Sequence, residues 1–473
     1  MAIKFGTDGW RAIIGEEYTF QNVKICAQGV ANYLKSNGYE SSGLIIGYDT
    51  RLKSAEFAES VAEVIAGNNI PVILCDRPTP TPVVSYNLIQ YECSAGIVIT
   101  ASHNPPNWNG FKFKPGYGGS ASPDIVKRLE EFISIVETTG DIQTISIEDG
   151  LNTGLIEKIN PDPSYMNHIA GMVNLKSIRD AGLNVVIDSM HGAGATYISR
   201  LVEGGTTKIF EIRSEINTSF PDMAQPETIE SNLIPLKNKI LEVNGDVGLA
   251  TDGDADRLGI MDEDGQYIST LHAFALICNH ILTDLNMTGP IIKSITMTSM
   301  IDKLGELNKI PVITTPVGFK YLGPVMIEEN AMAAGEESGG YAFQGHIPER
   351  DGILSGLMIL NMMANTGKNP SELIHDLEEI VGPHFYSRID IEFDPQNKIK
   401  IIEKVSSIKP KHIAGIPVIK IDDQDGFKFI LENNNWGLIR FSGTEPLMRI
   451  YAEGIDKNIV SKILSECQSY ASL

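Results

Sequence analysis

The sequence predicts three similar α/β domains with mixed, mainly parallel sheets, followed by one α+β domain. Short apolar runs typical of buried strands alternate with amphipathic helical patterns, as in parallel sheets covered by helices. The alternation restarts at a period of roughly 100 residues, within the usual size of a domain. Beyond residue 369 the pattern changes to β runs separated by turns. At about 150 residues per domain, a chain of 473 residues suggests about three domains, with two or four also compatible.

The first unit begins with a helical pattern and then alternates between strands and helices. Gly67 is a typical C-cap for its second helix. Thr81 and Pro82 read as an N-cap followed by proline, which predicts a helix start. In chain order we expect a helix over 22–35, a strand over 44–48, a helix over 57–65, a strand over 72–75, a helix from 81, a strand over 95–100 and a helix from 122.

The second and third units repeat this pattern, and the last unit departs from it. The expected elements are a strand over 184–190, helices over 193–202 and 233–243, a strand over 246–251, a turn at 264–265, strands near 291–295, 311–315 and 331–334, a helix from 369, β runs over 385–393 and 417–451, and a closing helix over 457–470. We place the domains at 1–150, 151–257, 258–368 and 369–473.

The charge balance restricts the classes of partner. The chain carries 38 basic and 60 acidic residues, a net charge of −22. A surface this acidic repels nucleic acids and anionic lipids, so we expect no nucleic-acid and no membrane partner. The five cysteines form no CxxC pair, which favours a reducing compartment over disulfides or zinc. The first residues show no signal-peptide pattern, so we expect a cytoplasmic protein.

Polar residues gather in four glycine-marked loops, each after an expected strand, where open α/β sheets bind ligands. The first follows the strand over 95–100 and contains Ser102 and His103, with Lys112 nearby. A serine at a rigid strand end is a candidate nucleophile, although Ser102 and Asn104 also fit as caps of a turn. A serine hydrolase is a further alternative, but the sequence has no G-x-S-x-G motif, and His103 is poorly placed as the base for its neighbour.

The second loop places Asp252, Asp254 and Asp256 at alternate positions after the strand over 246–251. Alternate residues of an extended loop point the same way, and three converging carboxylates repel one another unless a cation lies among them. Oxygen ligands favour Mg²⁺ or Ca²⁺. An EF-hand does not fit because its sixth position, which requires glycine, is Arg257. We therefore expect Mg²⁺, completed by a phosphate oxygen, instead of a solvated acidic turn.

The third and fourth loops carry groups suited to a phosphorylated sugar. The third contains Glu336 and Ser338 among glycines, which suit vicinal sugar hydroxyls, although the loop taken alone also fits an ordinary surface loop. The fourth contains Arg440 and Gly443, with Arg449 close behind. Its guanidinium, hydroxyl and backbone N–H groups form a phosphate cradle, the alternative being a surface turn. Together the loops indicate phosphoryl transfer on a phosphosugar.

These motifs resemble the signature loops of the α-D-phosphohexomutase superfamily, in order along the whole chain. The matching segments are 6–11 for the N-terminal Gly-Thr-x-Gly-x-Arg element, 100–106 for the phosphoserine loop, 252–257 for the metal loop, 335–340 for the sugar loop and 440–446 for the phosphate loop. The resemblance implies a heart-shaped arrangement of four domains around a central cleft. It also implies Mg²⁺ as cofactor, glucose 1,6-bisphosphate as activator and intermediate, and a small hexose phosphate bound by a monomer or homodimer.

The resemblance also implies roles for individual residues. The implied catalytic residues are Ser102, Lys112, Lys320, His103 and Arg11; the substrate-binding residues are Glu336, Ser338, Arg257, Arg350, Arg440, Ser442, Gly443, Thr444 and Arg449; the metal ligands are Asp252, Asp254, Asp256 and Ser102. Lys112 and Lys320 are acid/base candidates, or plain charge stabilisers.

The substrate within the family depends on the sugar loop. Phosphomannomutase/phosphoglucomutases and phosphoglucosamine mutases usually have Ser-Gly-His there, whereas this chain ends the loop at Gly340. The segment 336–338 together with 318–320 is more similar to the phosphoglucomutase pattern. We therefore expect reversible conversion of glucose 1-phosphate to glucose 6-phosphate through phosphorylated Ser102. A phosphomannomutase, a phosphoglucosamine mutase and a catalytically weak bisphosphate-binding relative are the alternatives.

Overall fold

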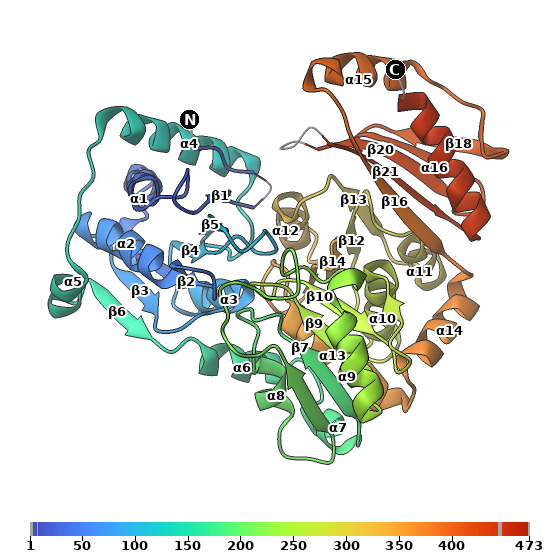
Figure 1. Ribbon diagram of the computed structural model, residues 1–473, viewed down its shortest axis with the longest axis horizontal. Coiled ribbons are helices and arrows are strands. Elements are labelled where there is room, and N and C mark those ends of the chain that lie inside the picture. Colours follow the sequence, from blue (N-terminus) through green and yellow to red (C-terminus); the bar gives the residue numbers. More distant parts are fainter. Residues whose placement is uncertain (1–2, 7, 443–446, 472–473) are drawn as a thin grey trace.

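The computed structural model describes residues 3–6, 8–442 and 447–471, which form four sheets in chain order. The first three sheets combine parallel and antiparallel strands, and the fourth is antiparallel. Figure 1 shows the N-terminal domain (blue) and the C-terminal domain (red) apart from each other, with the second and third domains (green to olive) between and below them. The expected fold class of three α/β domains and one α+β domain is confirmed.

The first sheet has the strand order β1-β5-β4-β2-β3-β6. Its strands are β1 (Trp10–Ile13), β2 (Leu44–Tyr48), β3 (Val72–Cys75), β4 (Ala95–Ile99), β5 (Trp108–Pro115) and β6 (Ile156–Ile159). Strands β4, β2, β3 and β6 are parallel, β5 pairs antiparallel with β4, and β1 pairs antiparallel with β5. The boundary expected at residue 150 falls before the end of this sheet, because β6 pairs with β3 along its whole length.

Helices cover both faces of the first sheet because its central strands are apolar on both sides. Ile46 and Ile97 belong to the core formed with α1 and α2, whereas Ile45 and Val98 pack with Leu88 of α3. The helices of this domain are α1 (Phe20–Ser36), α2 (Ser54–Gly67), α3 (Thr81–Gln90), α4 (Pro123–Thr139) and α5 (Ile147–Thr153).

The second sheet has the order β11-β10-β9-β7-β8 and the third β13-β12-β14-β15. The strands are β7 (Asn184–Asp188), β8 (Lys208–Ile212), β9 (Val247–Thr251), β10 (Leu258–Met261), β11 (Tyr267–Ile268), β12 (Ile291–Ser294), β13 (Val312–Thr315), β14 (Ala333–Gly335) and β15 (Tyr341–Phe343). The boundary expected at residue 257 falls inside the second sheet, because β10 runs back antiparallel along β9.

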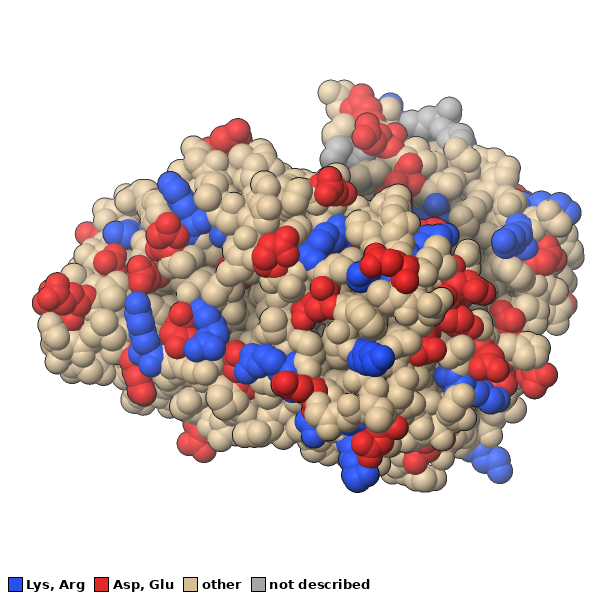
Figure 2. All heavy atoms as spheres, turned by 60° about the horizontal axis from the view of Figure 1, so that its bottom comes forward, with Lys and Arg blue, Asp and Glu red and all other residues tan. Residues whose placement is uncertain are grey.

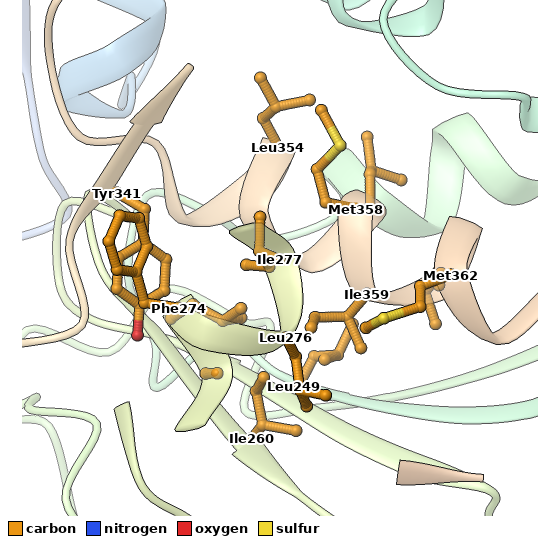
Figure 3. Packing of buried hydrophobic residues seen from close by; sticks show 14 of the residues in the cluster. Leu249, Ile260, Phe274, Leu276, Ile277, Tyr341, Leu354, Met358, Ile359 and Met362 are labelled. Atoms are coloured by element: carbon orange, nitrogen blue, oxygen red, sulfur yellow. The ribbon is translucent and has the colours of Figure 1, made fainter. Parts of the chain in front are cut away.

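The second and third domains share one hydrophobic core. The helices of these domains are α6 (Asp162–Ala170), α7 (Leu175–Asp180), α8 (Tyr197–Val202), α9 (Ile234–Val243), α10 (Thr270–Thr283), α11 (Met300–Asn308), α12 (Phe319–Glu328) and α13 (Gly352–Thr366). Leu354 and Ile359 of α13 and Phe274 of α10 pack with Leu249 and Ile260 from the second sheet (Figure 3). Because one apolar cluster spans both domains, their loops are held in a fixed relation.

The C-terminal domain is built on a meandering antiparallel sheet in the order β16-β21-β20-β19-β18-β17. Its elements are α14 (Pro370–Val381), β16 (Phe385–Glu392), α15 (Lys398–Ser407), β17 (His412–Ile413), β18 (Ile416–Asp422), β19 (Phe427–Leu431), β20 (Trp436–Phe441), β21 (Leu447–Gly454) and α16 (Lys457–Ala471). The helix start expected at Asn369 is confirmed by a capping box with Glu372. Helix α15 has no counterpart among the expected elements.

The charged surface is mixed in sign on the face that Figure 2 shows. Acidic and basic side chains lie interspersed there over the second and third domains and their neighbours. Within the described residues, no helix combines the length and apolar character needed to cross a bilayer.

Candidate active site

Ser102 lies just beyond the C-terminal end of β4. It is buried, and its φ of +51° falls in the left-handed region, which is uncommon for residues other than glycine. Its hydroxyl donates a hydrogen bond to Asp252 Oδ2 at 3.0 Å. The two loops approach so closely that a Cβ on Gly253 would lie 2.5 Å from the carbonyl oxygen of Ser102. The candidate nucleophile therefore faces the candidate metal loop of the next domain.

His103, which belongs to this serine loop, and Arg11, which comes from β1, both contact residues of the loop. The Nδ1 atom of His103 is 3.4 Å from Ser102 Oγ. Burial and the nearby Arg257 hold the pKa of His103 well below its usual range, so its imidazole is neutral. Arg11 donates to the side-chain oxygen of Asn104 at 2.7 Å and so supports the same loop.

The three aspartates of the metal loop follow β9 and converge as the sequence predicts. All three are fully buried, and each offers a carboxylate oxygen within 4.8 Å of the others. Ala255 has a φ of +56°, and this local bend turns the chain between Asp254 and Asp256. Burial and the two neighbouring carboxylates raise the pKa of Asp252 well above its usual value. The loop therefore concentrates negative charge in a buried site.

A divalent cation fits the oxygen atoms that this loop leaves unused. Asp254 Oδ1 and Asp256 Oδ1 are buried, and neither has a hydrogen-bond partner within the described part of the chain. The other oxygens are engaged: Asp252 Oδ1 accepts two backbone N–H groups at 3.1 Å each. Buried carboxylate oxygens without donors are costly unless a cation compensates them. The donor set, which contains only oxygen, suits Mg²⁺.

Lys112 on β5 bridges the first domain to the metal loop. Its Nζ lies 2.7 Å from Asp254, 3.2 Å from Asp256 and 2.9 Å from Asp8. Burial alone would lower the pKa of Lys112, but these carboxylates raise it above its usual value, so the amine is charged. Thr81 also belongs to this site: it is the first residue of α3 instead of its cap, and its hydroxyl donates to Asp254 at 2.6 Å.

Arg350 and Asp8 connect the third domain to the reaction centre. The guanidinium of Arg350 lies 2.7 Å from Asp8 and 2.9 Å from Asp256. Arg257 bonds Glu227 at 3.2 Å, and its Nε is 3.9 Å from both Asp252 and Asp256. Two of the four arginines that the resemblance assigns to substrate, Arg257 and Arg350, therefore lie beside the aspartates of the metal loop as well.

The sugar loop connects β14 to β15. Glu336 is buried and accepts the backbone N–H of Gly318 at 2.7 Å, and burial raises the pKa of its carboxyl group. Ser338 is half-buried. Glu337 points elsewhere, because Tyr386 donates to it at 2.8 Å from the C-terminal domain. Glu336 and Glu337 therefore have different surroundings.

Lys320 lies in the first turn of α12 and is half-buried. Burial and the nearby Arg440 guanidinium lower the pKa of Lys320. A lysine with a lowered pKa exchanges its proton more readily near neutral pH, which suits an acid/base role.

The two arginines of the phosphate loop face each other across neighbouring strands. Arg440 on β20 pairs in register with Arg449 on β21. Arg440 Nε donates to Asp425 at 2.9 Å, and Arg449 Nε donates to Asp390 at 3.4 Å. Ser442 is buried beside them. Two further expected members of this cradle, Gly443 and Thr444, lie outside the described residues.

The sequence interpretation missed several side chains that complete the site. Asp8 belongs to the N-terminal glycine motif, and its charge beside Arg11 is a signal that we did not use. Arg51 follows β2 and binds the serine loop. Ligands of open α/β sheets bind at the carboxyl ends of the strands, so its position after a strand could have marked it as a site residue. Asp425 accepts the backbone N–H of Val317 at 2.9 Å in addition to Arg440, and only the assembled domains reveal that bridge.

Comparison with known proteins finds one family along the chain. The family models that match are the alpha/beta/alpha domains I, II and III of phosphoglucomutase/phosphomannomutase at residues 2–139, 163–265 and 270–380, and its C-terminal domain at 396–467.

Individual relatives cover nearly the whole chain. A phosphoglucomutase/phosphomannomutase of Thermococcus kodakarensis is 29% identical over 449 residues, covering 95% of this chain and 94% of the relative. A phosphoglucosamine mutase of Acetivibrio thermocellus is 29% identical over 467 residues, covering 97% and 96%. A crystal structure from Thermus thermophilus that bears the name phosphomannomutase superposes with a TM-score of 0.84 at 29% identity and covers 99% of both chains.

Proposed function

Since this chain belongs to the phosphoglucomutase/phosphomannomutase family, we propose that it is a phosphohexomutase that converts glucose 1-phosphate reversibly to glucose 6-phosphate. In the first half-reaction the bond between phosphorus and Ser102 Oγ breaks, a bond to the free sugar hydroxyl forms, and the hydroxyl loses its proton. The resulting glucose 1,6-bisphosphate then returns its other phosphoryl group to Ser102.

The residues around Ser102 have complementary tasks in this proposal. The charged amine of Lys112 compensates negative charge on the transferring group. The neutral imidazole of His103, close to Ser102 Oγ, and the amine of Lys320 on the sugar side are the candidates for moving the hydroxyl proton. Arg11 keeps the serine loop in place through Asn104.

Mg²⁺ would be held by Asp252, Asp254, Asp256 and the oxygen of Ser102. When bound, it supplies positive charge that offsets the charge of the transferring phosphoryl group. The two unpartnered oxygens of Asp254 and Asp256 support this assignment.

The observation that supports glucose as the substrate is the hydrogen bond between Gly318 and Glu336. The two segments whose pattern resembles phosphoglucomutases are 318–320 and 336–338, and this bond joins them at 2.7 Å. Glu336 and Ser338 then read sugar hydroxyls, since a buried carboxylate discriminates strongly between hydroxyl configurations. The names of the relatives divide among glucose, mannose and glucosamine phosphates, so substrate preference is the part of the proposal that most needs a test.

The phosphate that does not react binds at the Arg440–Arg449 pair in both half-reactions. Ser442, Gly443 and Thr444 add hydroxyl and backbone donors to it, and Arg257 and Arg350 bind substrate nearer the metal loop. One cradle must then accept glucose 1-phosphate and glucose 6-phosphate in opposite orientations.

The decisive measurement compares kcat/KM for glucose, mannose and glucosamine 1-phosphates, with Mg²⁺ and a trace of the matching 1,6-bisphosphate. The highest value for glucose supports the proposal. A higher value for mannose or glucosamine 1-phosphate would identify that compound as the preferred substrate. A protein that binds the bisphosphate without turning over any of the three sugars would be the catalytically weak relative.

Two treatments test the covalent chemistry. Ser102→Ala is expected to abolish turnover with an unchanged thermal midpoint, and mass spectrometry should find phosphate on Ser102 in active enzyme. Excess EDTA is expected to abolish activity, and added Mg²⁺ to restore it. Full activity of either preparation would refute the corresponding assignment.

A further inference from the structure

Arg51 makes an unusual set of contacts with the serine loop. It follows β2 in the first domain and is 3% exposed. Its guanidinium donates to four main-chain carbonyl oxygens of the segment that contains Ser102. The acceptors are Ser102 at 2.6 Å, Asn104 at 2.5 Å, Pro105 at 2.7 Å and Trp108 at 3.2 Å.

The loop also has hydrogen bonds of its own: Ser102 N–H donates to Thr100 Oγ1 at 2.8 Å, and Asn104 N–H donates to the carbonyl oxygen of Ala101 at 3.0 Å. Pro105 and Pro106 have no N–H group, so part of the segment contributes no main-chain donors. Ser102 has a left-handed φ, which a residue with a Cβ keeps only when its surroundings enforce it. The planar fork of one arginine supplies several donors in a fixed geometry and can bind carbonyl groups that diverge from one point.

Arg51 is itself fixed from two domains. Asp49 lies 3.2 Å from its guanidinium and also accepts its backbone N–H at 2.9 Å. The ring of Phe220, a buried residue of the second domain, lies over the guanidinium at 5.2 Å. The guanidinium is therefore neither free to swing towards a substrate nor hydrated.

We propose that Arg51 is a positioning residue for phosphoryl transfer: it holds the backbone of the serine loop so that Ser102 Oγ stands beside Asp252. This inference rests on the proposed mutase function. Both terminal nitrogens of Arg51 are engaged by carbonyl oxygens, so Arg51 acts through the loop and not on the phosphate. Substrate binding by the sugar and phosphate loops does not depend on it.

Arg51→Lys separates geometry from charge. A lysine keeps the positive charge but replaces the planar fork with a single ammonium group, which cannot reach the same four acceptors. We expect kcat to fall roughly a hundredfold, the size of effect that a misplacement of about 1 Å produces, while KM stays unchanged. Transfer of one phosphoryl group from glucose 1,6-bisphosphate to Ser102, followed by mass spectrometry, should slow by the same factor.

Arg213→Lys is the matched control. Arg213 is also largely buried, binds Asp188 and donates to the carbonyl oxygen of Asn232 at 2.9 Å, but it does not touch the serine loop. We expect Arg213→Lys to lower the thermal midpoint about as much as Arg51→Lys and to leave kcat unchanged.

The outcomes distinguish this inference from the proposed function. A wild-type protein that turns over no hexose phosphate refutes the function. An active wild type together with a folded Arg51→Lys variant of unchanged kcat, or with only KM altered, refutes the positioning role. If Arg51→Lys is not recovered folded, Phe220→Leu removes only the ring above the guanidinium: a loss of kcat at unchanged KM supports the role, and an unchanged kcat refutes it.

Discussion

The carboxylate of Asp8 lies among three buried cations from two domains. It contacts Lys112 at 2.9 Å, Lys114 at 3.3 Å and Arg350 at 2.7 Å. Burial would raise the pKa of Asp8, but these cations hold it well below its usual value, so the carboxylate is charged. One side chain therefore compensates charges that would otherwise repel one another beside the metal loop.

Asp8→Asn should cost both stability and activity. Removing one partner of a buried ion pair typically costs about 3–5 kcal/mol, because the remaining charges are uncompensated. We expect kcat to fall roughly tenfold or more, because Lys112 and Arg350 move. Urea unfolding and steady-state kinetics measure the two effects. Asp180→Asn, which breaks the exposed pair with Lys176, should leave stability almost unchanged, because solvent screens such a pair.

Lys428 predicts a pH dependence of stability. It is 6% exposed, donates to the carbonyl oxygen of Ile295 at 2.6 Å and lies over the Trp436 ring at 4.0 Å. Burial and the nearby Lys293 lower its pKa to about 7. The unfolded chain keeps this proton up to about pH 10.4. Between these values the unfolded state binds more protons, so the contribution of Lys428 to stability rises with pH.

Lys428→Met removes this titration. The difference in free energy of unfolding between wild type and variant should rise from pH 7 towards pH 10 by at most about 1.4 kcal/mol per pH unit. Urea midpoints at several pH values measure it, with the exposed Lys462→Met as control. A difference that stays constant over this range would contradict the burial argument.

At the scale of elements, two neighbouring charged residues in the connection from β15 to α13, Arg350 and Asp351, have different roles. Asp351 caps α13 by accepting the N–H of Leu354 at 2.8 Å and also accepts the hydroxyl of Tyr165 at 2.7 Å. Arg350 directly precedes this cap, and its side chain passes over Gly340 of the sugar loop. The cap thereby fixes the position from which Arg350 reaches Asp8.

Gly340 allows this crossing. A Cβ at this position would lie 2.3 Å from Cδ of Arg350, so the arginine side chain occupies the space that any other residue would fill. Gly340→Ala should displace Arg350 from Asp8 and Asp256 and lower kcat roughly tenfold. The comparison is Gly171→Ala, whose new Cβ would find its nearest atom 3.3 Å away. An equal kcat for the two variants would show that the position of the Arg350 side chain does not depend on the space left by Gly340.

At the scale of the whole molecule, Glu453 ties the C-terminal domain to the third domain. It is fully buried on β21 and accepts Ser299 N and Oγ at 2.8 and 2.9 Å, Trp436 Nε1 at 2.5 Å and the hydroxyl of Thr298. Because Arg440 and Arg449 lie on the same sheet, this anchor sets where the phosphate cradle stands relative to the sugar loop.

Glu453→Ala should loosen this anchor. It leaves several buried donors unpaired, at a cost of about 3 kcal/mol or more. We expect KM to rise for both glucose 1-phosphate and glucose 6-phosphate, because the same cradle serves both. Glu453→Gln keeps the shape and should show a smaller change in the same direction. A rise in KM for only one of the two substrates would contradict a shared cradle.

Local signals in the sequence determined the fold class and the candidate reaction centre. Strand and helix periodicity and the turn residues predicted three α/β units and an antiparallel last domain. The spacing predicted that Asp252, Asp254 and Asp256 converge, but in the structure they do so across a turn with Ala255 at a φ of +56°, and not along an extended loop. Asp252 then meets Ser102 because both loops leave the carboxyl ends of their strands.

The partners of these groups were decided only by the tertiary structure. Asp8 meets Arg350 across 342 positions of the chain, and Thr81 meets Asp254 across 173. The domain edges at β6 and β10 likewise depend on strand pairing and not on local pattern. Periodicity and capping report the environment of neighbouring residues, whereas a buried charge is satisfied by whichever opposite charge the packed domains bring within hydrogen-bond distance. That information exists only once the four domains are assembled.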